Sequence, residues 1–229
     1  MVKSFYETMV VACETIRDEV ADALTRLGLD YPVIWLEGGL HNSPDRLRAR
    51  LAEVLAEVDG QCERLLMTLG YCGGGVNDLK TGGYVTILPL ADDCLSLLMG
   101  SMAARRASAL VPTYYLTAGW LRHENNLVSD HERLAAVSGQ AKADRITGMM
   151  LRHYHRFGLV DTGVYDLERT AGRVAPLAER LGLKVENLPG DVSWLDRLLI
   201  GPHDDFLILP PYTELVFDHW SDFLLCGGQ

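Results

Sequence analysis

The sequence predicts an α/β protein with a doubly wound, mainly parallel sheet and helices on both faces. Two observations predict this class: short apolar runs rich in β-branched residues alternate with segments whose apolar residues recur at helical spacing. A third is size, since 229 residues with 48% hydrophobic content can bury a substantial core. No linker or low-complexity tract divides the chain, so we expect a single domain over residues 1–229, with a helical cap or insertion near residues 121–155.

The first unit shows the repeating pattern. Residues 8–13 form an apolar run that ends in Cys13, and residues 14–27 follow with apolar side chains at helical spacing. Gly28 is a typical residue to end such a helix, because it adopts the left-handed conformation without strain. The pattern predicts a strand, then a helix.

The next four strands repeat this order. Ser43 and Pro44 are typical of the N-cap and first position of the second helix, which we expect to end near Gly60. We expect the strands at residues 33–36, 64–69, 84–89 and 111–117. Two further helices are expected at residues 76–80 and 95–107.

The remaining chain begins with a more polar helical stretch, over residues 121–155. Strand patterns return at residues 158–161, 184–186 and 206–209, and residues 165–181 read as a helix between the first two. Strands separated by helices favour parallel pairing, because a parallel pair needs a crossover connection.

Charge and composition exclude several classes of partner. Lys and Arg number 21 against 31 Asp and Glu, a net charge of −10, with no basic block to follow a phosphate backbone. No apolar run approaches the roughly 20 residues of a membrane-spanning helix, and no signal peptide precedes the first unit. We therefore expect a cytoplasmic protein that binds neither nucleic acid nor membrane. In a reducing compartment, five cysteines are more often core residues, metal ligands or catalytic thiols than disulfides.

Four metal-binding residue types occupy the same place in four successive units. Cys13 ends the first expected strand, His41 follows the second, Cys72 follows the third and Cys94 follows the fourth. Right-handed crossovers bring the carboxyl ends of parallel strands to one edge of the sheet, which is also where ligands bind. The sequence therefore predicts a thiolate-rich metal site at that edge.

Several interpretations of this site stay open. Three thiolates and an imidazole form a tetrahedral zinc set, which is catalytic if one position is exchangeable. A 4Fe-4S cluster held by three cysteines with one open iron is the main competitor, and we favour the single ion. The alternative without a metal is that the cysteines are small buried hydrophobes and that His41 caps the following helix.

Gly73, Gly74 and Gly75 form a candidate cofactor-binding loop directly after Cys72. Glycines let the backbone approach a ligand closely and present N–H groups to an anion. The loop is not a P-loop, because no Gly-Lys-Ser/Thr follows, and a tight turn is the other interpretation.

Three carboxylates flank the expected ligands. Asp92 and Asp93 precede Cys94, where an N-cap accounts for one of them, and Glu37 precedes His41. We select Asp92, Asp93 and Glu37 as candidate acid-base or orienting groups beside the metal.

The sequence resembles a family of bacterial and archaeal proteins called domain of unknown function 1638. The likeness is carried by residues 10–13, 36–44, 69–74, 92–94 with 97–101, and 114–120. Ala118 stands where the family usually has proline. The resemblance implies a shared set of Cys and His positions without a reaction, and it implies a place beside corrinoid-dependent methyl transfer, with a corrinoid protein as partner.

Two functions follow from these observations. The first is a metal-dependent enzyme, a transferase, that activates a thiol or another small-molecule substrate, with methyl transfer as one reaction. The second is a noncatalytic accessory protein that stores, delivers or senses a metal or cofactor. An open coordination position favours the first and a closed site the second.

Overall fold

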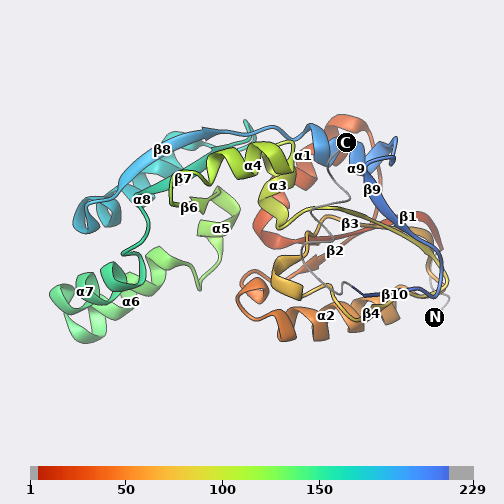
Figure 1. The fold of residues 1–229 in the computed structure, drawn as a ribbon, viewed down its shortest axis with the longest axis horizontal. Coiled ribbons are helices and arrows are strands. Elements are labelled where there is room, and N and C mark those ends of the chain that lie inside the picture. The colour runs from red at the N-terminus through yellow and green to blue at the C-terminus, as the bar shows by residue number, and fades with distance from the viewer. Residues whose placement is uncertain (1–4, 217–229) are drawn as a thin grey trace.

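Two sheets lie side by side in the computed structural model, which describes residues 5–216 (Figure 1). The larger sheet has five strands in the order β2-β1-β3-β5-β9. The smaller has three, in the order β6-β7-β8. The strands of the larger sheet are β1 (Tyr6–Cys13), β2 (Val33–Leu36), β3 (Cys62–Met67), β5 (Val85–Pro89) and β9 (Phe206–Leu209). Those of the smaller are β6 (Thr113–Leu116), β7 (Arg156–Asp161) and β8 (Lys184–Pro189).

All neighbouring strands are parallel except β9, which pairs antiparallel with β5 at the edge of the larger sheet. A separate antiparallel pair joins β4 (Leu79–Lys80) to β10 (Glu214–Leu215). The prediction of an α/β protein with a mainly parallel sheet is confirmed. The strands divide into two sheets, a mainly parallel one of five strands and a parallel one of three, because β6 pairs with β7 instead of extending the larger sheet.

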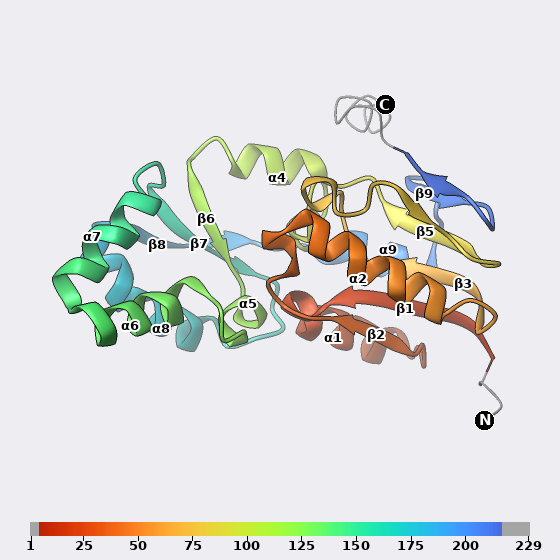
Figure 2. The same cartoon turned by 90° about the horizontal axis from the view of Figure 1, so that it is seen from below.

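Alternate residues of β1 face opposite layers, as the two-residue period of a strand requires. Val10 and Ala12 pack against α1 (Arg17–Leu27) and α9 (Ser193–Ile200). Val11 packs against α2 (Pro44–Glu57), which lies across the other face of the sheet (Figure 2). Helices therefore cover both faces, which explains why β1 is apolar on both of its sides.

The smaller sheet carries its own apolar core. Phe157 and Leu159 of β7 are fully buried against Leu177 of α8 (Leu167–Leu181). The helical stretch expected at residues 121–155 forms α6 (Leu127–Ser138) and α7 (Gln140–Met150), a hairpin at the far end of this half (Figure 1). The hairpin packs on α8 and lies away from the larger sheet.

Two expected helices are wrong in detail. Residues 76–80 form a turn and β4, because pairing with β10 overrides the local pattern. The stretch at 95–107 divides into α3 (Cys94–Leu98) and α4 (Met102–Ser108) at Gly100, whose φ is +76°. A side chain at Gly100 would meet the Asp191 carboxylate at 2.5 Å, so glycine and a new N-cap at Ser101 end the first helix.

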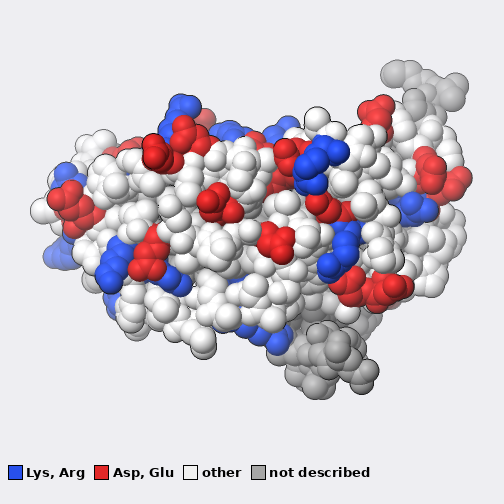
Figure 3. Space-filling view, turned by 90° about the horizontal axis from the view of Figure 1, so that it is seen from above, with Lys and Arg blue, Asp and Glu red and all other residues white. Residues whose placement is uncertain are grey.

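Within residues 5–216, no helix has both the length and the apolar content that crossing a bilayer demands. Acidic and basic side chains are interspersed on the face drawn in Figure 3. The mixture agrees with the absence of a basic block in the sequence.

Candidate functional site

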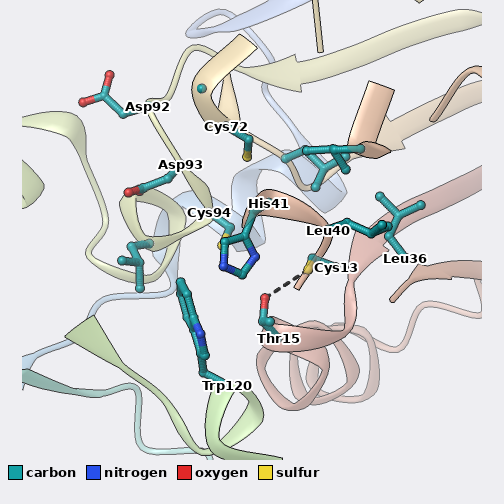
Figure 4. Close-up of a pocket in the computed structure, with 14 residues that line it drawn as sticks. Cys13, Thr15, Leu36, Leu40, His41, Cys72, Asp92, Asp93, Cys94 and Trp120 are labelled. Atoms are coloured by element: carbon teal, nitrogen blue, oxygen red, sulfur yellow. Dashed lines mark hydrogen bonds between the residues drawn. The ribbon is translucent and has the colours of Figure 1, made fainter. Parts of the chain in front are cut away.

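One pocket collects the four predicted metal-binding residues at the carboxyl end of the larger sheet (Figure 4). Cys13 is the last residue of β1, Cys72 lies in the short 3-10 helix η3 (Cys72–Gly74) after β3, and Cys94 begins α3 after β5. His41 lies in the 3-10 helix η2 (Leu40–Asn42) after β2. The cavity they line measures about 280 Å³, and we call it the thiol pocket.

Two loops that carry cysteines are fastened to each other. The backbone N–H of Tyr71 donates to the Ala91 carbonyl at 2.8 Å, and that of Cys72 donates to the Asp92 carbonyl at 2.9 Å. Gly70 permits this approach, because a Cβ there would lie 2.6 Å from the Asp93 nitrogen. The loop after β3 and the loop after β5 thus hold Cys72 and Cys94 at the same pocket.

The backbone after Cys72 has an uncommon conformation. Cys72, Gly73 and Gly74 all have positive φ, at +49°, +66° and +94°. For cysteine the left-handed region costs about 1–2 kcal/mol, and such strain is typical of functional sites. Of the three candidate glycines, Gly73 lines the thiol pocket, whereas Gly75 packs so closely on Leu47 that a Cβ would lie 2.5 Å from its side chain.

Burial keeps the thiols protonated. Desolvation raises the pKa of Cys72 to about 12 and raises those of Cys13 and Cys94 above the ordinary value. The Cys72 residue is only half-buried, but its sulfur is surrounded by protein. The thiols also raise one another's pKa, most clearly at Cys94, where Cys13 and Cys72 contribute after burial. A positive charge in the pocket would favour the ionised form of these cysteines.

Thr15 opposes this effect. Its hydroxyl donates a hydrogen bond to the Cys13 sulfur at 3.1 Å and lowers the pKa of both Cys13 and Cys94. Because Thr15 also lines the pocket, its hydroxyl is the group best placed to stabilise a thiolate at these two cysteines.

His41 packs edge-on against Trp120, with 4.7 Å between ring centroids and 66° between planes. Burial lowers the imidazole pKa, and His123 lowers it further. Although Asp93 opposes these two effects, the net shift favours the neutral imidazole, which is the form that binds a metal ion. Trp120 comes from α5 (Ala118–Arg122), so the second half of the chain supplies one wall of the pocket (Figure 4).

The three candidate carboxylates have different surroundings. Asp93 is the N-cap of α3: it accepts from the Ser96 backbone N–H at 3.2 Å and pairs with Arg105 at 3.2 Å. Asp92 also lines the pocket, although Figure 4 shows its carboxylate directed away from the thiols. Its pKa is raised by burial and by Asp93, and Oδ1 has no hydrogen-bond partner among the described residues. Glu37 lies outside the pocket and is 61% exposed near Arg50.

Sequence reasoning did not single out Thr15, Gly70 or Trp120. A hydroxyl two residues beyond Cys13 was an available signal for Thr15, whereas the roles of Gly70 and Trp120 depend on contacts between distant segments. The rest of the lining is mainly apolar: Leu36, Leu40, Leu47, Leu69 and Leu95.

The donor chemistry suits a soft metal, but the side chains are not gathered around one point. In the described part of the chain, no three His, Cys, Asp or Glu side chains are arranged to hold a metal ion together. A change of cysteine rotamer moves a sulfur by about 3 Å. Binding at this pocket would therefore require the sulfurs to turn toward a common centre.

Fold and site together define a mixed α/β protein with a thiol-lined pocket beyond the carboxyl ends of its parallel strands. The family model for the protein of unknown function DUF1638 matches residues 35–199, so the chain belongs to this family. His41, Cys72 and Cys94 lie inside the matched range and Cys13 precedes it. No curated protein and no solved structure matches the chain.

Proposed function

We propose that this protein is a metal-dependent enzyme that binds zinc in the thiol pocket through Cys13, Cys72 and Cys94, with His41 as an exchangeable fourth donor that leaves a position open to substrate. The observation that carries the proposal is that three cysteines from the ends of three neighbouring strands line one pocket. We also propose that the larger sheet is doubly wound, as the sequence predicts. Proteins with such a sheet bind ligands where the strand order reverses, and in the order β2-β1-β3-β5 that point lies between β1 and β3.

The state of the thiols supports a cationic ligand. Buried thiols that raise one another's pKa stay protonated until a positive charge enters, and metal binding would then release their protons. Thiolates and a neutral imidazole select zinc or an iron-sulfur cluster over hard cations. A 4Fe-4S cluster on the three cysteines is the alternative cofactor.

The pocket's size and lining indicate the substrate class. A cavity of about 280 Å³ with leucine walls admits a small molecule. When bound, zinc with an open position lowers the pKa of a coordinated thiol and makes it a better nucleophile. A small thiol is therefore the substrate that we propose, with Trp120 and the leucines excluding water from it. Methyl transfer, with a corrinoid protein as partner, is the reaction that the family resemblance adds.

A second candidate function is a noncatalytic accessory protein that holds a metal or cofactor. The surroundings of two candidate carboxylates favour this accessory function. Asp93 already caps α3 and pairs with Arg105, and Glu37 lies outside the pocket. An enzyme that activates a bound thiol needs a group to accept its proton. Asp92 is half-buried, and its Oδ1 has no hydrogen-bond partner among the described residues, so it is the candidate that remains for this role.

The test is metal analysis of protein purified without oxygen or chelators. We expect one zinc ion per chain, or the visible absorption of an iron-sulfur cluster if the alternative cofactor is correct. Cys72→Ser and Cys94→Ser should lose the metal. The matched control is Cys62→Ser, since Cys62 is a buried cysteine at the opposite end of β3, paired with Tyr6. Equal metal loss in all three variants, or no metal in the parent, would overturn the proposal.

A further inference from the structure

A second hollow lies at the carboxyl edge of the smaller sheet, between α5 after β6 and α8 after β7. Its volume is about 330 Å³. In parallel sheets this edge is the usual place for ligands, because the loops converge there. The hollow is lined by Ala118, Leu121, Arg122, Tyr165, Asp166, Arg169, Thr170 and Arg173.

The charges around this hollow are mainly positive. Arg122 is held by Asp18 of α1 through two hydrogen bonds, at 3.1 and 2.5 Å. Asp166 is the N-cap of α8 and accepts from the backbone N–H of Arg169 at 2.9 Å. Arg169 and Arg173 form no ion pair with any carboxylate in residues 5–216.

In a chain whose net charge is −10, two neighbouring arginines without carboxylate partners indicate a site for an anion. Arg169 and Arg173 are four residues apart on α8, so they share a face and repel each other. Among the described residues, the one polar contact of these guanidinium groups joins Arg173 to the Ser129 hydroxyl at 3.4 Å. Most of their N–H donors are therefore directed at solvent or at an occupant of the hollow.

We propose that this hollow binds the phosphate group of a small-molecule ligand. Guanidinium groups match the geometry of phosphate oxygens and form paired hydrogen bonds with them. The two positive charges without carboxylate partners suit a dianion. The Asp166 carboxylate already caps the N-terminus of α8, so the arginine side chains supply the positive charge of the hollow.

This site is separate from the thiol pocket. α5 lies between the two, with Trp120 lining the thiol pocket while Leu121 and Arg122 line the hollow. The phosphate proposal therefore stands on its own residues and does not depend on metal binding.

The experiment is a titration of the full chain with inorganic phosphate at constant ionic strength, followed by calorimetry and by phosphorus NMR line width. We expect saturable binding. Arg169→Gln and Arg173→Gln should each weaken it at least tenfold, because each removes one bidentate donor. Arg180→Gln is the matched control, since it removes the same charge from the last turn of α8, and it should bind like the parent.

Two further anions make the test decisive. Chloride at the same ionic strength should not compete, and equal effects of chloride and phosphate would overturn the proposal. Malonate tests a carboxylate ligand in place of a phosphate, and saturable malonate binding with no phosphate binding would also overturn it. Both arginine variants are exposed substitutions, and circular dichroism should show an unchanged fold.

Discussion

The backbone N–H of Cys72 donates a hydrogen bond of 2.9 Å to the carbonyl oxygen of Asp92. This bond ties the loop after β3 to the loop after β5, so the spacing of Cys72 and Cys94 is fixed by contact between two backbones. It does not depend on the cysteine side chains themselves. The thiol pocket is therefore sensitive to changes that separate these loops.

Gly70→Ala tests this dependence. A Cβ at Gly70 would lie 2.6 Å from the Asp93 nitrogen and 2.7 Å from the Ala91 carbonyl, both backbone atoms that cannot move aside cheaply. We expect a loss of about 1–3 kcal/mol in the free energy of unfolding, the usual range for overpacking. Urea denaturation followed by circular dichroism measures it.

The control for this change is Gly172→Ala in α8, where an added Cβ meets nothing within 4 Å. Alanine in an open helical position should stabilise the protein by about 0.5–1 kcal/mol. If Gly70→Ala were as stable as Gly172→Ala, the close contact between the two loops would be refuted.

The second prediction is that Cys72 reacts slowly with alkylating reagents in the metal-free protein. With a pKa of about 12 against an ordinary 9.0, Cys72 has about a thousandfold less thiolate at pH 7 than an exposed cysteine. Alkylation of Cys72 by iodoacetamide should be slower by at least that factor. Site-resolved mass spectrometry measures the rate, and the same peptide in urea provides the unhindered reference. Rapid labelling of folded Cys72 would show that the sulfur is not desolvated.

The third prediction concerns Glu19 and the way the free energy of unfolding depends on pH. Glu19 lies on α1, is 1% exposed, and accepts a hydrogen bond from Thr162 at 3.1 Å through Oε1, while Oε2 has no partner among the described residues. Burial raises its pKa from 4.5 to about 7. Between these values the folded protein keeps a proton that the unfolded chain has released, so this residue's contribution to stability falls as pH rises through the window.

Glu19→Gln should remove that loss. We expect the variant to match the parent near pH 4 and to be more stable at pH 8, by up to about 3 kcal/mol, which is the free energy of the pKa difference. Urea denaturation at both pH values measures this. Glu132→Gln, an exposed change on α6, should show no such divergence from the parent. If the difference in free energy of unfolding between Glu19→Gln and the parent stayed constant across pH, the raised pKa of buried Glu19 would be contradicted.

The local pattern of the chain was enough to predict most of the strand-helix units and the sheet edge at which the three cysteines lie. Cys13, Cys72 and Cys94 each follow an apolar strand, and parallel pairing of β1, β3 and β5 then requires a shared edge. Non-local pairing was not predictable in this way. The local sequence of a strand does not show whether it extends the larger sheet or begins another sheet, as β6 does.

The other features that the sequence prediction missed have different causes. α9 buries Trp194, Leu195 and Leu198 at helical spacing, so the signal for this helix was present in the sequence. The sequence could not show that Glu37 lies outside the thiol pocket, because its distance from the pocket depends on how the loop before His41 turns. Gly39, with φ of +85°, begins that turn.

Asp93→Asn separates an enzyme from an accessory protein. Asparagine is as good an N-cap as aspartate, so α3 should keep its first turn, and only the partly exposed ion pair with Arg105 is lost, at a cost of about 1 kcal/mol. The aspartate charge raises the pKa values of Cys72 and Cys94, so removing it makes these thiols easier to ionise. Zinc content should therefore stay near that of the parent.

If Asp93 orients the substrate or accepts its proton, Asp93→Asn should lower thiol binding or turnover by about 10- to 100-fold while zinc is retained, the usual scale for groups that support a metal ligand. Competition with a chromogenic thiolate probe measures thiol affinity of the zinc-loaded protein. Asp45→Asn is the control, because this side chain is 91% exposed on α2, outside the thiol pocket. Parent-like thiol binding in Asp93→Asn, and again in Asp92→Asn, would leave the pocket without an acid-base group. The accessory function would then replace the enzymatic one.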